Sequence, residues 1–297
     1  MHAILGFLLA LCAAMALCIT ERTKPADNVH GYIVVGGGPG GAPVACNLAR
    51  AGHSVLLMEA GDDGSMNTNS QIASLYANGF TDPKLRWDFF ARNHDNDKRT
   101  LQHNQLVWRH GFTGYLDTVQ GNASIWHGHD DLISILQSIS ASLNQTHPIL
   151  QSLTSVVNFL SPARDKTQGV FSPTIHTDPR LRRSSSRDYI LSTLSDEKTY
   201  PLHCQLNTLA TRVLFDNATS PPRATGISYL PAPDLYRADP LSTSSPPPTE
   251  GIAYARKEVI LSAGSFNSPQ LVKLPGIGPR RELQSFGIPR SWPTTPV

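Results

Sequence analysis

A glycine cluster near the amino terminus has the spacing of a dinucleotide-binding loop. Gly36, Gly38 and Gly41 satisfy the pattern G-x-G-x-x-G. The first glycine permits a tight turn, the second lets the backbone approach a pyrophosphate, and the third lets a helix pack close to a strand. The N–H groups of the turn and the positive end of the following helix would then stabilise phosphate charge. These residues predict a phosphate-binding site.

Glu59, an acidic residue at the end of the next apolar run, would complete the site. Its carboxylate can accept hydrogen bonds from the two ribose hydroxyls of an adenosine, and it disfavours a 2′-phosphate, which argues against NADP. FAD and NAD share the same ADP half, so these residues alone leave both open. A ligand-free glycine turn is the alternative, but the order of strand, glycines, helix, strand and acid favours a ligand.

Three short elements must hold these residues in place. Residues 31–35 form an apolar, β-branched run typical of a central parallel strand, and 54–58 form a second one. Between them, residues 42–51 have helical spacing and end at Gly52. The unit is β-α-β and about 30 residues long, as a right-handed crossover requires. An α/β fold with a Rossmann-like domain is therefore expected.

The rest of the chain divides into regions of different character. We predict a polar, turn-rich stretch over 61–110, a helix within 130–160, a helix over 188–194 with Ser186 as N-cap, strands over 209–215, 224–230 and 252–262, and a disordered Pro/Ser-rich insert over 231–250.

Three segments resemble the glucose-methanol-choline (GMC) oxidoreductases. Val34–Ala42 with Leu57–Gly61 resembles the start of that family, and Glu258–Gly278 resembles its second signature, with Pro275 in place of the usual serine. Thr211–Phe215 is similar to the strand whose valine backbone holds the adenine of FAD. The ascomycete members that act on aryl alcohols or sugars are the most similar.

The resemblance implies FAD in a Rossmann-like domain, covered by a substrate or cap domain of the α+β class that is only partial here. Such enzymes oxidise the CH–OH group of an alcohol or sugar by transferring a hydride to the flavin, which oxygen or a quinone then reoxidises. The cofactor-binding residues implied are Gly36, Gly38 and Gly41 for the pyrophosphate, Glu59 for the ribose, Val213 for the adenine, and Ala263 and Gly264 against the cofactor; Ala60 and Gly61, which follow Glu59, are also expected at the cofactor site.

Two departures from the family bear on activity. The Gly-Gly-Ser-Ser-x-x-Asn segment that lies over the flavin is absent where Val107–His110 runs into Gly111–Asp117. The family's catalytic histidine falls beyond residue 297, so no catalytic residue is assigned. We expect an incomplete gene product. A catalytically inactive secreted FAD-binding remnant is the alternative, and an NAD-dependent dehydrogenase is disfavoured by the second signature.

These observations give an expected division of the chain. It consists of a signal peptide (1–19), the first part of the FAD-binding domain (31–110), a partial cap region (111–199), the second part of the FAD-binding domain (200–289) and an atypical tail (290–297).

The amino-terminal residues predict secretion. An apolar run over residues 3–19 precedes polar residues, and Ala14-Met-Ala16 fits the small-x-small pattern of signal peptidase sites. A single membrane anchor is the alternative; with cleavage, no membrane attachment is expected. In a secreted chain Asn122, Asn144 and Asn217 become candidate N-glycosylation sites.

Composition and the remaining motifs exclude other functions. A net charge of +2 without a basic stripe argues against a nucleic-acid partner. Cys46 and Cys204 alone would remain after cleavage and make no disulfide framework. His127-Gly-His129 before Asp130 and Asp131 fixes no metal geometry, and a helix start explains the two acids equally well. No metal is expected.

Overall fold

The computed structural model describes residues 28–72, 75–91, 103–108, 130–144, 166, 184–196, 198–216, 218–219, 221–242 and 248–289. The chain divides into two compact units, one made of residues 1–115 and 184–297 and the other of residues 116–183. Each is described by itself.

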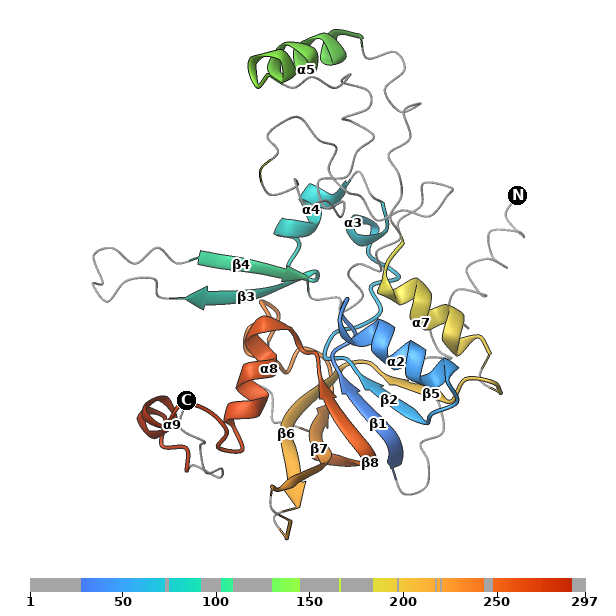
Figure 1. Ribbon diagram of the computed structural model, residues 1–297, viewed down its shortest axis with the longest axis vertical. Helices are drawn as coiled ribbons and strands as arrows, with labels where there is room; N and C mark the ends of the chain where they lie inside the picture. Colours follow the sequence, from blue (N-terminus) through green and yellow to red (C-terminus); the bar gives the residue numbers. More distant parts are fainter. Residues whose placement is uncertain are drawn as a thin grey trace. The chain divides into compact units, whose positions relative to one another are not determined.

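The first unit is built on a six-stranded sheet (Figure 1). Its strands, in spatial order, are β5 (Leu202–Gln205), β2 (Val55–Met58), β1 (Val29–Val35), β8 (Gly251–Leu261), β7 (Arg223–Pro231) and β6 (Thr208–Asp216). The first four are parallel, whereas β7 and β6 are antiparallel to their neighbours. This arrangement confirms the predicted α/β fold with a Rossmann-like domain.

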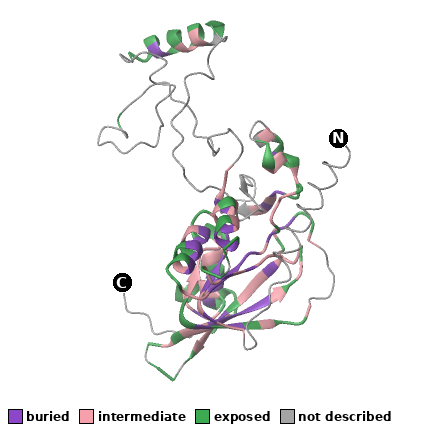
Figure 2. Cartoon of the chain, turned by 90° about the vertical axis from the view of Figure 1, so that its right-hand side faces the viewer, coloured by how far each residue is buried: buried purple, intermediate pink, exposed green. Residues whose placement is uncertain are grey.

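β1 is the centre of the sheet because it pairs with β2 on one side and β8 on the other. Val34 lies opposite Leu57 in β2 and Ile260 in β8. The carboxyl-terminal half of β1 is the apolar run Ile33–Val35, which is buried on both faces of the sheet, and Figure 2 shows buried residues along the strands of the sheet. Ile33 contributes to the core on one face of the sheet and Val34 to the core on the other.

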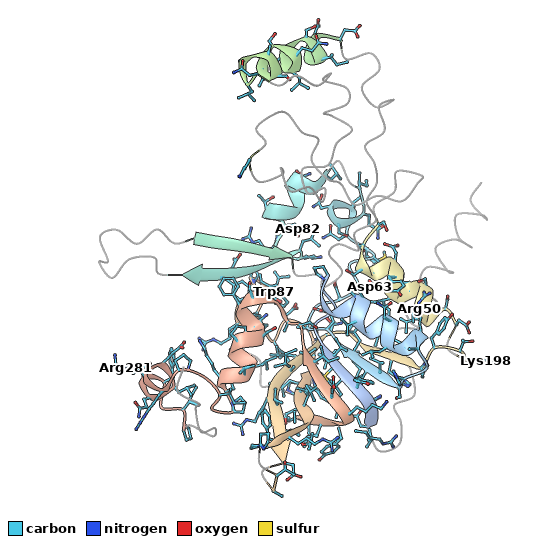
Figure 3. The ribbon with its side chains drawn as sticks, in the orientation of Figure 1. Arg50, Asp63, Asp82, Trp87, Lys198 and Arg281 are labelled. Carbon is cyan, nitrogen blue, oxygen red and sulfur yellow. The ribbon has the colours of Figure 1, made fainter. Side chains whose placement is uncertain are left out.

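Helices cover both faces. α2 (Gly41–Arg50) and α7 (Ser186–Leu194) pack against the Val34 face, where the small residues Ala45 and Ala49 are completely buried. The Arg50 guanidinium, labelled in Figure 3, lies 4.7 Å from the centre of the Tyr189 ring and joins the two helices. On the Ile33 face, α8 (Gly264–Lys273) contributes the buried Leu271, and α9 (Arg280–Ser285) follows it.

The remaining helices and strands among the described residues are short or lie outside the six-stranded sheet. The first unit also contains α3 (Thr68–Gln71), α4 (Tyr76–Thr81) and an antiparallel hairpin of β3 (Arg86–Ala91) and β4 (His103–Trp108). The second contains α5 (Asp130–Ser142), which places two acids in its first turn as expected. None of the described helices is long and apolar enough to cross a membrane.

The predicted insert over 231–250 differs from the structure in its first half. After β7 the chain makes a set of turns over 232–242 in which Asp239 is only 4% exposed. The Asp239 carboxylate accepts the Leu241 N–H at 2.8 Å, and the Asp88 N–H donates to the Ala238 carbonyl at 2.6 Å. These hydrogen bonds pair backbone groups of a segment whose Pro/Ser-rich composition predicts disorder. The insert is therefore ordered over 231–242, and residues 243–247 lie outside the described part.

Other expectations differ in detail or are not tested. α7 begins two residues earlier than predicted, and its N-cap is Ser185 rather than Ser186, in a capping box with Asp188. Cys46 and Cys204 are buried thiols. No group of three potential metal ligands occurs among the residues that the structure describes. The predicted signal peptide (1–19), His127, His129, Asn122, Asn217 and the tail (290–297) lie outside them.

A buried histidine at the start of β1 makes stability depend on pH. His30 is 1% exposed, and its ring lies edge-on to that of His203, with 5.4 Å between the ring centres. Burial, followed by repulsion from His203 and Arg256, lowers the pKa of His30 to about 4. The folded protein therefore keeps His30 neutral at pH values where the unfolded chain, with a pKa near 6.5, binds a proton.

We expect folding stability to fall as the pH drops from about 6.5 to about 4, with up to ~3 kcal/mol of the loss due to His30. Denaturant unfolding at several pH values checks this, with His30→Gln compared against His53→Gln, which changes a partly exposed histidine. His30→Gln should flatten the acid side of the curve and His53→Gln should not. Identical curves for the parent and His30→Gln would contradict the prediction.

Candidate functional site

A cavity of about 640 Å³ lies at the carboxyl ends of β1, β2 and β8. Its size is in the range of small-molecule and cofactor sites. In sheets with this topology, ligands bind beyond the carboxyl ends of the parallel strands. Most of the wall comes from the glycine loop, the end of β2, the start of β6, the turns after β7 and helix α8. The main lining residues are Gly36, Gly38, Gly40, Glu59, Ala60, Trp87, Thr208, Ala210, Thr211, Tyr236, Ala263, Gly264, Asn267 and Gln270.

The glycine loop is held so closely against β8 that side chains are excluded. Gly36 has φ of +99°, and a Cβ there would lie 2.4 Å from the Ser262 carbonyl oxygen. A Cβ on Gly41 would lie 2.0 Å from the Gly36 carbonyl oxygen. The Ser262 N–H donates to the Val35 carbonyl at 2.8 Å and fixes this approach. Gly36 and Gly38 line the cavity, while Gly41 lies behind them and allows α2 to start there.

Glu59 ties the end of β2 to the glycine loop. Its Oε2 accepts the Gly37 N–H at 2.6 Å and its Oε1 accepts the Gly61 N–H at 2.9 Å. The residue is 6% exposed and lines the cavity. A carboxylate has about four acceptor positions, so holding two N–H groups is compatible with accepting ribose hydroxyls as well. Gly61 thus acts through Glu59, while Ala60 lines the cavity itself.

The amino-terminal ends of two helices lie at the same cavity. Gly40 precedes α2 and Ala263 precedes α8; neither end has a side-chain cap or an acidic residue in its first turn. Both of these residues line the cavity. Helix amino termini carry partial positive charge and N–H groups without intrahelical acceptors, which suits a phosphate. The wall therefore fits the pyrophosphate of a dinucleotide without needing a charged side chain.

The loop that follows Glu59 is anchored to α7. Arg187 lies 2.9 Å from a carboxylate oxygen of Asp63. Burial alone would raise the pKa of Asp63, but hydrogen bonds from Ser65 and the Arg187 guanidinium outweigh it and lower that pKa. Asp63, labelled in Figure 3, is therefore an anion at neutral pH, and its ion pair with Arg187 holds the loop that follows Gly61.

The first residues of β6 form the cavity wall beyond Glu59. Val213, the residue of this strand that was expected to contact the adenine, lies further along β6. The Thr208 N–H donates to the Glu59 carbonyl at 2.9 Å, which brings Thr208–Thr211 to the cavity. Val213, predicted to hold the adenine, is 5% exposed, packs in the core and does not line the cavity. Ala210 does line it. The role of Val213 stays a prediction, and the position of Ala210 makes it the better candidate.

An aromatic wall was not expected from the sequence. The rings of Trp87, labelled in Figure 3, and Tyr236 are nearly perpendicular, with centres 5.2 Å apart. Phe89 stacks on Phe266 of α8, with 4.5 Å between the ring centres. The Tyr236 hydroxyl donates to Asn267 Oδ1, and Gln270 Oε1 is 3.2 Å away. Burial raises the pKa of Tyr236, so the hydroxyl keeps its proton at neutral pH. A planar ring is a suitable ligand for such a wall.

Two protein-family models match different parts of the chain, and each part contributes residues to the cavity wall. Residues 34–94 match the NAD(P)-binding Rossmann-like domain, and residues 162–291 match the GMC oxidoreductase family. The first match contains the glycine loop and Glu59. The second contains the β6 wall, the turns after β7 and helix α8.

Individual relatives agree with this assignment. The chain is 23% identical to ecdysone oxidase of Bombyx mori, over 93% of this chain and 46% of the relative. It is 28% identical to mitochondrial choline dehydrogenase of Homo sapiens, over 92% and 50%. A formate oxidase structure from Aspergillus oryzae shares the fold with a TM-score of 0.51, at 17% identity over 91% of this chain and 51% of that one. The chain thus spans about half the length of the curated relatives it matches.

The fold and the position of the cavity are those of the Rossmann class of dinucleotide-binding proteins. Within that class, the chain is a relative of the GMC oxidoreductases, which confirms the resemblance drawn from its motifs. Members of this family are flavoproteins, so the prediction of FAD as the cofactor is confirmed at the level of the family. The roles of the individual site residues stay predictions.

Proposed function

We propose that this chain binds FAD as the cofactor-binding part of a GMC-type oxidoreductase that acts on the CH–OH group of an alcohol or sugar. The observation that supports it best is the convergence of the glycine loop, Glu59 and the amino termini of α2 and α8 on one cavity. When bound, the flavin accepts a hydride and passes its electrons on. The chain's own residues hold the pyrophosphate and ribose and orient the cofactor.

Proton transfer is assigned to none of the described residues. Oxygen or a quinone as electron acceptor is part of the proposal and rests on the family alone. Secretion, with removal of residues 1–19 and glycosylation at Asn144 and the other sequons, is proposed from sequence; Asn144 is exposed after α5, where a glycan can be accommodated. A catalytically inactive FAD-binding chain is the alternative.

NAD is the competing cofactor because residues 34–94 match a family named for NAD(P). The ADP half of NAD would fit the same glycine loop and Glu59. The GMC match over residues 162–291, which includes the other wall of the cavity, favours FAD.

Titration of the purified chain with FAD tests the proposal. We expect quenching of flavin fluorescence at one FAD per chain and displacement of FAD by ADP, with riboflavin binding much more weakly because it lacks the ADP half. NAD should compete poorly. A chain that is folded by circular dichroism but takes up no FAD would contradict the proposal, and tighter binding of NAD would favour the dehydrogenase.

A further inference from the structure

The turns over 231–242 are attached to the cavity wall at independent points. The Ala238 carbonyl accepts the Asp88 N–H of β3, the Tyr236 ring contacts Trp87, and the Tyr236 hydroxyl donates to Asn267 of α8. Within the segment, the Asp239 N–H donates to the Tyr236 carbonyl at 2.9 Å. The segment therefore presents Tyr236 from a fixed backbone rather than from a loose loop.

The order of groups in a dinucleotide decides which part would meet Tyr236. A pyrophosphate on the glycine loop and a ribose at Glu59 leave the base for the part of the cavity beyond Glu59. The start of β6 bounds that part, since Thr208 donates to the Glu59 carbonyl. Tyr236 and the amides of Asn267 and Gln270 line the same cavity.

We propose that residues 235–237 of this segment, which line the cavity, are part of the cofactor site, and that Tyr236 packs its ring against the adenine of the bound dinucleotide. The inference rests on the proposed function. Tyrosine suits this role because its ring contributes a large, rigid contact surface. Its hydroxyl, held against Asn267 and Gln270, sets the side-chain amides of α8 at the edge of the base, where amides pair with adenine. The core of the Rossmann unit would then supply only part of the adenine site.

Calorimetric titration with ADP tests this directly, because ADP has the adenine and lacks the flavin. We expect Tyr236→Ala to weaken ADP and FAD binding by the same factor, about tenfold or more. Tyr236→Leu, which keeps apolar bulk, should lose most of the same affinity, and Tyr236→Phe should lose threefold or less. Leu241→Ala is the matched control, since it truncates an exposed side chain of the same segment and should leave the affinity unchanged.

The outcomes are distinct. Weakened FAD binding with unchanged ADP binding would place Tyr236 at the flavin end and overturn the inference. Unchanged binding of both ligands by Tyr236→Ala and Tyr236→Leu would overturn it as well. If the parent chain binds neither ADP nor FAD, the proposed function fails and the inference fails with it. The melting temperature of each variant, measured without ligand, shows whether a loss of affinity comes from unfolding of the chain or from the changed side chain.

Discussion

Replacing Gly36 with alanine is expected to abolish dinucleotide binding and to lower the free energy of unfolding by more than ~3 kcal/mol. Two effects add. A residue with a side chain at φ of +99° costs about 1 to 2 kcal/mol. The added Cβ would also lie 2.4 Å from the Ser262 carbonyl oxygen, a backbone atom that cannot turn away. Either the loop or the end of β8 must move, and both form the cavity wall.

Gly52→Ala is the matched control for this substitution. Gly52 has φ of +86° but no atom within 4 Å of a Cβ, and it lies at the end of α2 away from the cavity. It should lose only about 1 kcal/mol of stability. Urea unfolding measures the first effect and FAD titration the second. Equal losses of stability in both variants, with FAD affinity kept within threefold in Gly36→Ala, would show that the close approach to Ser262 has no such role.

Replacing Glu59 with alanine is expected to cost about 2 to 5 kcal/mol of folding stability, because it removes the acceptor from two buried backbone N–H groups. Dinucleotide affinity should fall with it, by at least ~30-fold. Glu59→Gln keeps the shape and one suitable oxygen, so its effect should be intermediate. Glu258→Ala, which truncates an exposed carboxylate on β8, is the control and should change neither quantity.

A second readout separates a ligand-binding role of Glu59 from a structural one. If the carboxylate faces the ribose, it repels a 2′-phosphate, and Glu59→Gln should raise the affinity for 2′,5′-ADP relative to ADP. A purely structural role would lower both affinities in proportion. Titration of the two nucleotides with the parent chain and with Glu59→Gln decides between these outcomes.

The β-α-β unit with its glycine loop could be predicted because the residues that define it are contiguous in the sequence. The expected strand over 31–35 and helix over 42–51 agree with β1 and α2 to within two residues. The three later strands agree with β6, β7 and β8 equally well. In β1 and β7 the apolar run coincides with the buried residues, and the ends of β1 and β2 place Gly36 and Glu59.

The remainder of the cavity depends on contacts between distant segments. Tyr236 lies in a Pro/Ser-rich stretch whose composition predicts disorder, yet its ordering comes from Asp88, Trp87 and Asn267, all remote in sequence. Val213 was placed in the correct strand, but an apolar pattern does not indicate which end of a strand reaches a cavity. Ala210 has no chemical signal of its own. Such residues become visible only when the sheet is assembled.

The position of β8 beside β1 has a consequence for synthesis of the chain. β1 ends at residue 35, but the strand that covers one of its edges starts at residue 251. At ordinary translation rates the ribosome needs about 10 to 40 s to make the intervening polypeptide. Throughout that interval β1, whose residues Ile33–Val35 belong to the core of the folded protein, has an open hydrogen-bonding edge, which can pair with other nascent chains. We therefore expect the emerging chain to depend on chaperones that shield this edge until β8 has been translated.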